Sequence, residues 1–166
     1  MKLKDLLNSK GKNHFYIVHL SYNGKNREKL WNFAKENSLI GLDLPGIVYD
    51  DWLKIRNSVA RRVSKTWIRQ FDTFCTEMQV GDVVIVLNGW DSVLGVAEIT
   101  RDRHEYNRIF SDKQIFFDHI RKVKWLKTNE YNARQKLPTQ LKGFNNTLSK
   151  VTPKSKRWEL LTNLDV

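Results

Sequence analysis

The residues that could carry catalytic or metal chemistry are few, and their spacing matches no common catalytic motif. The single cysteine, Cys75, follows Phe74 in an apolar pattern and excludes an internal disulfide. It has no metal-ligand spacing with the four histidines, which are His14, His19, His104 and His119. The chain also lacks the GxxxxGKS/T, GxSxG and HExxH motifs. We therefore expect no metal and no cofactor, and histidines that are structural or exposed.

The closest approach to an enzyme site is a nuclease-like set of two acids and a lysine. Its members would be Asp82, Glu98 and either Lys122 or Lys124. Asp82, however, follows Gly81 at a turn, and the segment after Glu98 lacks the lysine that such a set requires. We expect a protein that is not an enzyme, and nuclease activity is the alternative to test.

Positive charge is the most informative property of the composition. The formal net charge is +11, which predicts a polyanionic partner. From Trp52 to Phe71 the chain contains basic residues and no acidic residue, whereas a solvated helix face usually mixes the two signs. A second basic group lies in the segment RKVK. The predicted phosphate-binding residues are Lys54, Arg56, Arg61, Arg62, Lys65, Arg69, Arg121, Lys122 and Lys124.

Several apolar patterns predict the elements that position these residues. Residues 14–20 and 115–128 are expected to be strands, 81–100 a hairpin, and 26–38 and 157–164 helices. From 50 to 78 apolar residues recur every three or four positions, which predicts one helix, or two with a break near Ser64. Residues 39–46 are expected to form a loop, and most of the tail from 129 a loop with a short helix.

These elements predict an α/β chain of the α+β type: a small, twisted, mainly antiparallel β-barrel flanked by helices. Residues 1–13 would be an N-terminal extension and residues 14–166 a single domain. No apolar run approaches the length needed to span a bilayer, so we expect no membrane contact. With one cysteine and no leader peptide evident, a cytoplasmic location is expected.

A set of short motifs resembles a known superfamily. The motifs are W-x-F at 31–33, IGxD within 39–43, GD-x-V from Gly81, LG-x-x-E from Leu94 and H-x-R-x-V-x-W at 119–125. Their order and spacing are similar to those of the PUA-like superfamily, and above all to EVE- and YTH-type domains at the amino terminus of McrB-like restriction proteins. The likeness covers residues 14 to 152.

The resemblance implies a partly closed barrel whose pocket accepts one base. McrB-like proteins use this domain to find modified DNA, while a GTPase motor and a partner nuclease cut it. The chain would then be the DNA-binding, targeting module of such a restriction system, reading a methylated base by base flipping. The alternatives are an RNA-binding reader of the same fold and a basic protein-interaction domain. The sequence does not identify the modified base.

Trp90 is the leading candidate to contact a base. It lies in the hairpin turn NGWDS, where an exposed ring would stack on a base, although it could instead fold back over the hairpin. Related domains place an aromatic residue where this chain has Leu42, and some YTH readers complete their cage with leucine. The full predicted base pocket is Leu42, Asp43, Tyr49, Trp52, Asn88, Trp90 and Tyr106.

Overall fold

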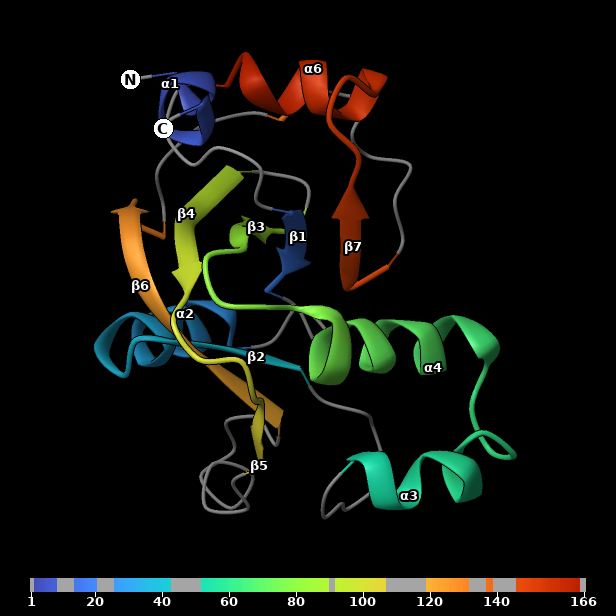
Figure 1. The fold of residues 1–166 in the computed structure, drawn as a ribbon. Coiled ribbons are helices and arrows are strands. Elements are labelled where there is room, and N and C mark those ends of the chain that lie inside the picture. The colour runs from blue at the N-terminus through green and yellow to red at the C-terminus, as the bar shows by residue number, and fades with distance from the viewer. Residues whose placement is uncertain are drawn as a thin grey trace.

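The fold is a curled sheet with helices packed around it (Figure 1). The computed structural model describes residues 2–8, 14–20, 26–42, 52–89, 92–106, 119–131, 137–138 and 146–164. The strands are β1 (Phe15–His19), β2 (Leu39–Leu42), β3 (Val83–Asn88), β4 (Ser92–Ile99), β5 (Glu105–Tyr106), β6 (His119–Thr128) and β7 (Leu148–Val151). The helices are α1 (Leu3–Asn8), α2 (Arg27–Glu36), α3 (Trp52–Val59), α4 (Lys65–Asp72), the π-helical turn η1 (Thr73–Glu77) and α6 (Lys156–Thr162).

The sheet is mainly antiparallel, as predicted. Its strand order is β2-β6-β4-β3-β1-β7, and β5 pairs with β6. Among these pairs only β1 and β3 run parallel, with Phe15 beside Val83 and His19 beside Leu87. The long strand β6 pairs with β2 through its first half and with β4 through its second half, so the sheet curls into an open barrel. The predicted α+β fold is confirmed.

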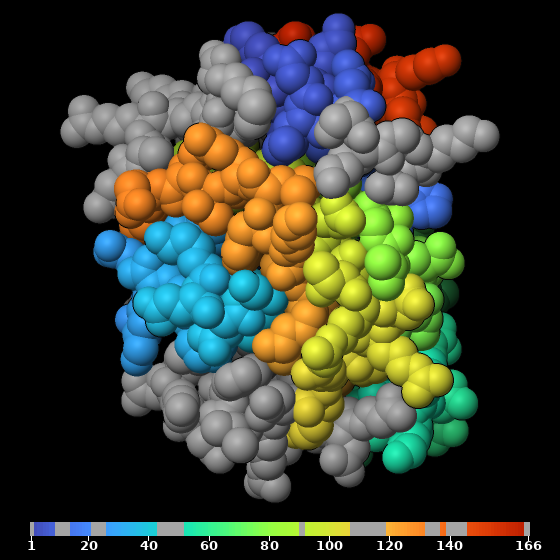
Figure 2. Space-filling view, turned by 60° about the vertical axis from the view of Figure 1, so that its left-hand side comes forward, coloured from blue at the N-terminus to red at the C-terminus, as the bar shows by residue number. Residues whose placement is uncertain are grey.

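Apolar side chains cover both faces of the central strands. In β1, Tyr16 and Val18 belong to one core cluster, and Phe15 and Ile17 belong to the other. Because both faces are buried, residues 83–87 of β3 form an apolar run in place of the alternating pattern of a half-exposed strand. In Figure 2, α2 and β2 (cyan) lie against β6 (orange), next to the β4–β5 segment (yellow).

The helical pattern of residues 50–78 forms two helices with a break before Ser64. The Ser64 side chain accepts a hydrogen bond from the Trp67 backbone N–H at 3.4 Å and caps α4. A turn over residues 60–63 separates α3 from α4, so Arg61 does not continue the α4 face that carries Lys65 and Arg69. The basic residues of this segment are therefore divided among α3, the turn and α4.

Two predictions about loops are wrong. Residues 39–42 form β2, because all four are buried and pair with the first half of β6. Residues 148–151 form β7 on the edge of the sheet, where they pair with β1. Both strands are only four residues long, too short to show a clear apolar pattern in the sequence.

The two chain ends pack together at one end of the molecule (Figure 1). The Leu3 backbone N–H donates a hydrogen bond to the Leu164 carbonyl oxygen at 2.9 Å, and Leu7 and Leu161 are buried in the same core cluster. Thus α1, inside the expected N-terminal extension, packs against α6. No helix among the described residues is long and apolar enough to cross a membrane.

Candidate nucleic-acid interface

The end of β1 holds the hairpin tip in place. The His19 Nδ1 atom lies 2.8 Å from the Gly89 carbonyl oxygen. Burial lowers the pKa of His19, and the positive charges of Arg157 and Arg27 lower it further. The imidazole is therefore neutral at pH 7, and its Nδ1–H donates to the carbonyl. Beside this contact, the Arg27 Nη1–H donates to the Asn88 side-chain oxygen at 3.5 Å.

A cleft of about 380 Å³ lies between α4 and β7. Its cations are Arg69 from α4, Lys150 from β7 and Arg157 from α6, and Glu77 is the acidic residue among the lining side chains. The Glu77 carboxylate accepts a hydrogen bond from the Thr73 hydroxyl at 3.1 Å. The cleft therefore carries a net positive charge. The remaining lining residues are Thr66, Gln70, Thr73, Asn146, Leu148 and Ser149.

Gln70 connects the two walls of this cleft. Its side-chain oxygen accepts a hydrogen bond from the Leu148 backbone N–H at 2.8 Å, and its side-chain N–H donates to the Thr66 carbonyl oxygen at 3.4 Å. Because Gln70 is buried, these bonds hold β7 at a defined position against α4. The spacing between Arg69 and Lys150 is set by this contact.

The cations of the cleft differ in their surroundings. Arg69 and Lys150 are exposed, and the Lys150 ammonium lies 5.9 Å from the centre of the Tyr16 ring. Arg157 is partly buried, and burial lowers its pKa to about 10. Arg157 therefore stays charged at neutral pH. Its helix begins where Ser155 accepts a hydrogen bond from the Trp158 backbone N–H at 3.2 Å. Three separate elements thus present guanidinium and ammonium groups to one cleft, an arrangement suited to phosphate oxygens.

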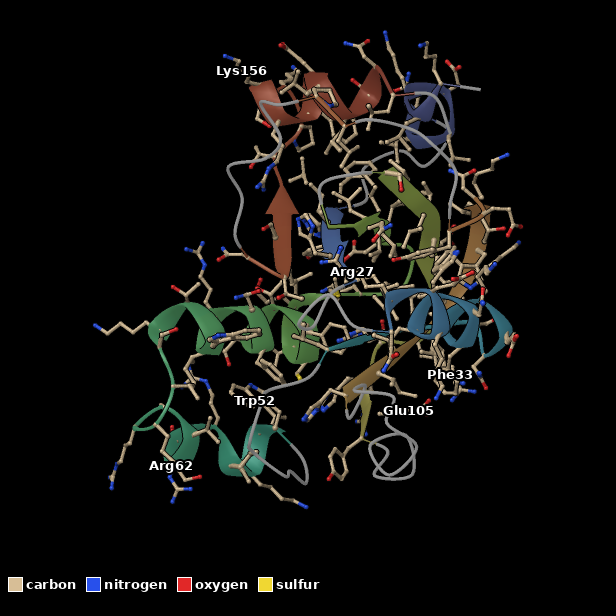
Figure 3. All side chains as sticks on the ribbon, turned by 180° about the vertical axis from the view of Figure 1, so that it is seen from behind. Arg27, Phe33, Trp52, Arg62, Glu105 and Lys156 are labelled. Carbon is tan, nitrogen blue, oxygen red and sulfur yellow. The ribbon has the colours of Figure 1, made fainter. Side chains whose placement is uncertain are left out.

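A second groove, of about 720 Å³, runs over the exposed side of α2. It mixes acidic and basic residues, and the partly buried rings of Phe33 and Tyr131 form part of its lining. Arg27, labelled in Figure 3, lines this groove and also contacts Asn88 at the end of β3. The other lining residues are Asn26, Glu28, Lys29, Asn32 and Glu36.

The predicted basic residues of the helical segment do not form one face. Arg69 lines the cleft, whereas Arg62 lies at the far end of the α3 region, well separated from Arg27 in Figure 3. Arg56 pairs with Asp72 instead: its Nε and Nη2 groups donate to the two carboxylate oxygens, each at 2.7 Å. The remaining members, which are Lys54, Arg61 and Lys65, are exposed.

Trp52 is a core residue, which corrects its predicted place in a base pocket. Its side chain is fully buried, its ring centre lies 4.9 Å from that of Phe71, and its indole N–H donates to the Asp72 carboxylate at 3.0 Å. A ring held in this way has no free face to stack on a base.

Arg121 is also a structural residue, which corrects its predicted contact with phosphate. It is fully buried, and its guanidinium donates to the carbonyl oxygens of Phe74, Arg101 and Asp102. Its neighbours in the sequence lie elsewhere: the Lys122 ammonium donates to the Asn37 carbonyl oxygen at 3.3 Å, and the exposed Lys124 pairs across the sheet with Glu98. None of these three residues lines the cleft.

The predicted base pocket is described only in part. Asp43, Tyr49 and Trp90 lie outside the described residues. Leu42 is buried in the core and Asn88 is buried beside Arg27. Tyr106 lies on β5, where its ring centre is 5.4 Å from that of His119. The structure thus places Asn88 beside Arg27 near the end of β1, whereas Tyr106 lies on β5 beside His119.

Sequence reasoning missed His19, Arg27, Lys150 and Arg157 as site residues. Lys150 falls in the tail that was expected to be loop, and Arg157 is the first residue of the helix expected over residues 157–164. Their position in the same cleft as Arg69 depends on the position of β7, which carries no strong sequence signal. Two basic residues in the first turn after the Ser155 cap, Lys156 and Arg157, are the weak signal that the chain offers.

Comparison with family models gives one match, described as "Domain of unknown function (DUF8426)", over residues 16–152. The chain belongs to this family. The DUF8426 match runs from β1 to β7, so it includes two walls of the cleft and the hairpin. No curated protein matches the sequence.

Solved structures similar to this DUF8426 member are YTH domains. The Mmi1 YTH domain in complex with RNA is 14% identical, with a TM-score of 0.38, over 71% of this chain and 55% of that chain. The YTH domain of the Zygosaccharomyces rouxii MRB1 protein in complex with N6-methyladenosine RNA is 12% identical, with a TM-score of 0.39, over 72% and 61%. This chain spans little more than half the length of those chains. The solved structures similar to this chain are thus YTH domains, and the resemblance to McrB-like proteins stays a prediction.

Proposed function

We propose that the protein is a non-enzymatic nucleic-acid-binding domain that reads a modified base. The observation that carries the proposal is the cleft between α4 and β7, where Arg69, Lys150 and Arg157 converge from three elements. A strand of nucleic acid laid along this cleft would bring its phosphates to these cations and release counterions.

The base would bind beside the hairpin tip. His19 anchors that tip through Gly89, and Arg157 and Arg27 are both close enough to His19 to lower its pKa. Arg157, which lines the cleft, and Arg27, which lines the groove over α2, therefore both lie near the end of β1. A base turned out of its strand there would lie next to Arg27 and Asn88. Stacking on aromatic rings contributes about 1–3 kcal/mol per base, comparable with the few kcal/mol that base extrusion costs.

Asp82, one of the two acids of the nuclease-like set, is held by backbone hydrogen bonds. One Asp82 carboxylate oxygen accepts from the His14 backbone N–H at 3.0 Å, and the other accepts from the Gln79 backbone N–H at 2.9 Å. Asp82 is buried at the start of β3. A carboxylate held by two backbone donors is suited to fixing a turn.

The finer form of the proposal is a reader of methylated duplex DNA. In that role the domain would target a McrB-like restriction system in the cytoplasm, alongside a GTPase motor and a partner nuclease. An RNA reader of the same fold and a basic protein-interaction domain are the competing roles.

The test is fluorescence anisotropy with labelled oligonucleotides of one sequence. Duplex DNA and single-stranded RNA are compared, each without a mark and with N6-methyladenine; 5-methylcytosine and 5-hydroxymethylcytosine are added in the DNA series. The proposal expects binding to nucleic acid and tighter binding to one marked form. A preference for marked RNA would replace the DNA role by the RNA role. An equal affinity for every marked and unmarked probe would refute base reading, and no binding at low salt would refute the proposal as a whole.

A further inference from the structure

Three side chains with metal-binding atoms converge at the edge of the sheet, away from the cationic cleft. Cys75 comes from η1, His104 from the segment between β4 and β5, and His119 from the first position of β6. One ligand atom of each, the Sγ atom and two imidazole nitrogens, lies within 4.8 Å of the other two. Because the three residues are far apart in the sequence, their spacing along the chain gave no sign of this cluster.

The surroundings hold two of these side chains and leave the third adjustable. His119 is fully buried: its ring is perpendicular to that of Phe71, with centres 5.3 Å apart, and Tyr106 packs against it. Cys75 is buried in the core beside it. His104 is only partly buried, and its ring centre lies 5.4 Å from that of His119. A metal ion would therefore enter from the His104 side.

One thiolate and two imidazoles form a ligand set typical of Zn²⁺. With Zn–S near 2.3 Å and Zn–N near 2.0–2.1 Å, ligand atoms of a tetrahedral site lie about 3.4–3.6 Å apart. The three ligand atoms lie within 4.8 Å of one another, so bringing them to these distances needs shifts of about an ångström. Rotation of the His104 side chain can supply such a shift. We propose that Cys75, His104 and His119 bind a single Zn²⁺ ion, with water in the fourth position.

Binding releases one proton, because the Cys75 thiol must ionise to ligate the metal while the two imidazoles bind through neutral nitrogens. The Arg121 guanidinium interacts electrostatically with Cys75, which favours the thiolate. The same positive charge opposes a divalent cation nearby. With three protein ligands and this guanidinium, the site should bind Zn²⁺ more weakly than a closed four-ligand structural site.

The metal would join three elements that are already linked at this edge by hydrogen bonds from Arg121 to the carbonyl oxygens of Phe74, Arg101 and Asp102. β5 has only two residues, Glu105 and Tyr106, and both pair with the start of β6. A Zn²⁺ bridge from His104 to His119 and Cys75 would fix the connection before β5 to the sheet and to η1. The metal would thus have a structural role. Its site is separate from the cationic cleft, and the proposal does not depend on the proposed nucleic-acid function.

The test uses the untagged 166-residue chain, stripped with a chelator and titrated with Co²⁺ as a spectroscopic stand-in for Zn²⁺. The proposal expects one equivalent of Co²⁺ to give thiolate-to-cobalt absorption in the near ultraviolet and d–d bands of a tetrahedral ion. Excess Zn²⁺ should remove both signals and raise the melting temperature of the chain.

His104→Ala should abolish the cobalt bands, because it removes one of the three protein ligands. The variant is expected to fold, since His104 is the most exposed of the three. His104→Cys should restore them, with stronger thiolate absorption from the second sulfur. His14→Ala is the matched control, since His14 is half-exposed and lies outside the cluster. Absence of the bands in the unaltered chain, or equal bands in His104→Ala, would overturn the proposal.

Discussion

The cleft makes a quantitative prediction about the salt dependence of binding. Arg69→Ala and Lys150→Ala together remove the two exposed cations that face each other across the cleft and leave the partly buried Arg157 in place. Each cation that neutralises a phosphate contributes about 0.9 to the slope of log K against log salt for duplex DNA, and about 0.7 for a single strand. The double variant should therefore reduce the magnitude of the slope by about 1.8 or about 1.4, respectively.

This change in slope can be read as a change in affinity. Between 50 mM and 200 mM salt, a slope difference of about 1.8 corresponds to roughly a 12-fold ratio. The variant should therefore lose roughly 12-fold more affinity at the lower salt than at the higher salt. Fluorescence anisotropy over a series of salt concentrations measures this directly, and thermal unfolding checks that the variant remains folded.

The control variant is Lys54→Ala with Arg62→Ala. Both side chains are exposed on the α3 side, and neither lines the cleft. The two double variants each lose two of the eleven net positive charges, so they differ only in where the charge is removed. We expect a much smaller change in slope for the control. Equal changes would show that overall charge, and not the cleft, attracts the nucleic acid, and would refute this reasoning.

Three further predictions concern stability and base recognition. Gly95→Ala should lower the free energy of unfolding by about 1–3 kcal/mol, because a Cβ there would lie 2.8 Å from the Trp31 ring; chemical denaturation measures this, and no change would show that the contact relaxes freely. Asp72→Asn should destabilise the protein at neutral pH. Hydrogen bonds from Arg56 lower the pKa of Asp72, so the stability that this carboxylate contributes is present above its ordinary value of 3.8 and is lost as the pH falls through the lowered pKa. The difference from the unaltered protein in urea melts should therefore narrow below pH 3.8, and a constant difference would contradict the assignment. Trp90→Ala should weaken binding to the marked base more than binding to unmarked nucleic acid, and equal losses would assign Trp90 to packing.

The central strands and main helices were predictable because their patterns are long and regular. The run VVIVL and its partner after the turn predicted the hairpin, which is β3 and β4. The cap of α4 at Ser64 also had a local signal. β2 and β7 could not be predicted, since four residues carry too little pattern, and their strand conformation depends on pairing with β6 and β1.

Charge predicts a polyanionic partner, but it did not indicate which basic residues line the cleft. Arg121 shares a strand with the exposed Lys124, yet tertiary packing turns it inward onto three carbonyl oxygens. Arg56 meets Asp72 because α3 and α4 fold back on each other, which no spacing along one helix indicates. Lys150 and Arg157 become neighbours of Arg69 only when β7 joins the sheet. The role of a side chain could therefore be predicted from the sequence where it is local, and could not be predicted where it depends on long-range contacts.

The most direct test of the central claim is to map the nucleic-acid contact by NMR. Backbone amide shifts of the ¹⁵N-labelled chain would be followed as a short marked oligonucleotide is added. The account predicts the largest shifts along both walls of the cleft, near Arg69, Ser149 and Lys150, and at Asn88 and Gly89 beside the end of β1. Shifts confined to α3 and the following turn, with the cleft unaffected, would contradict it.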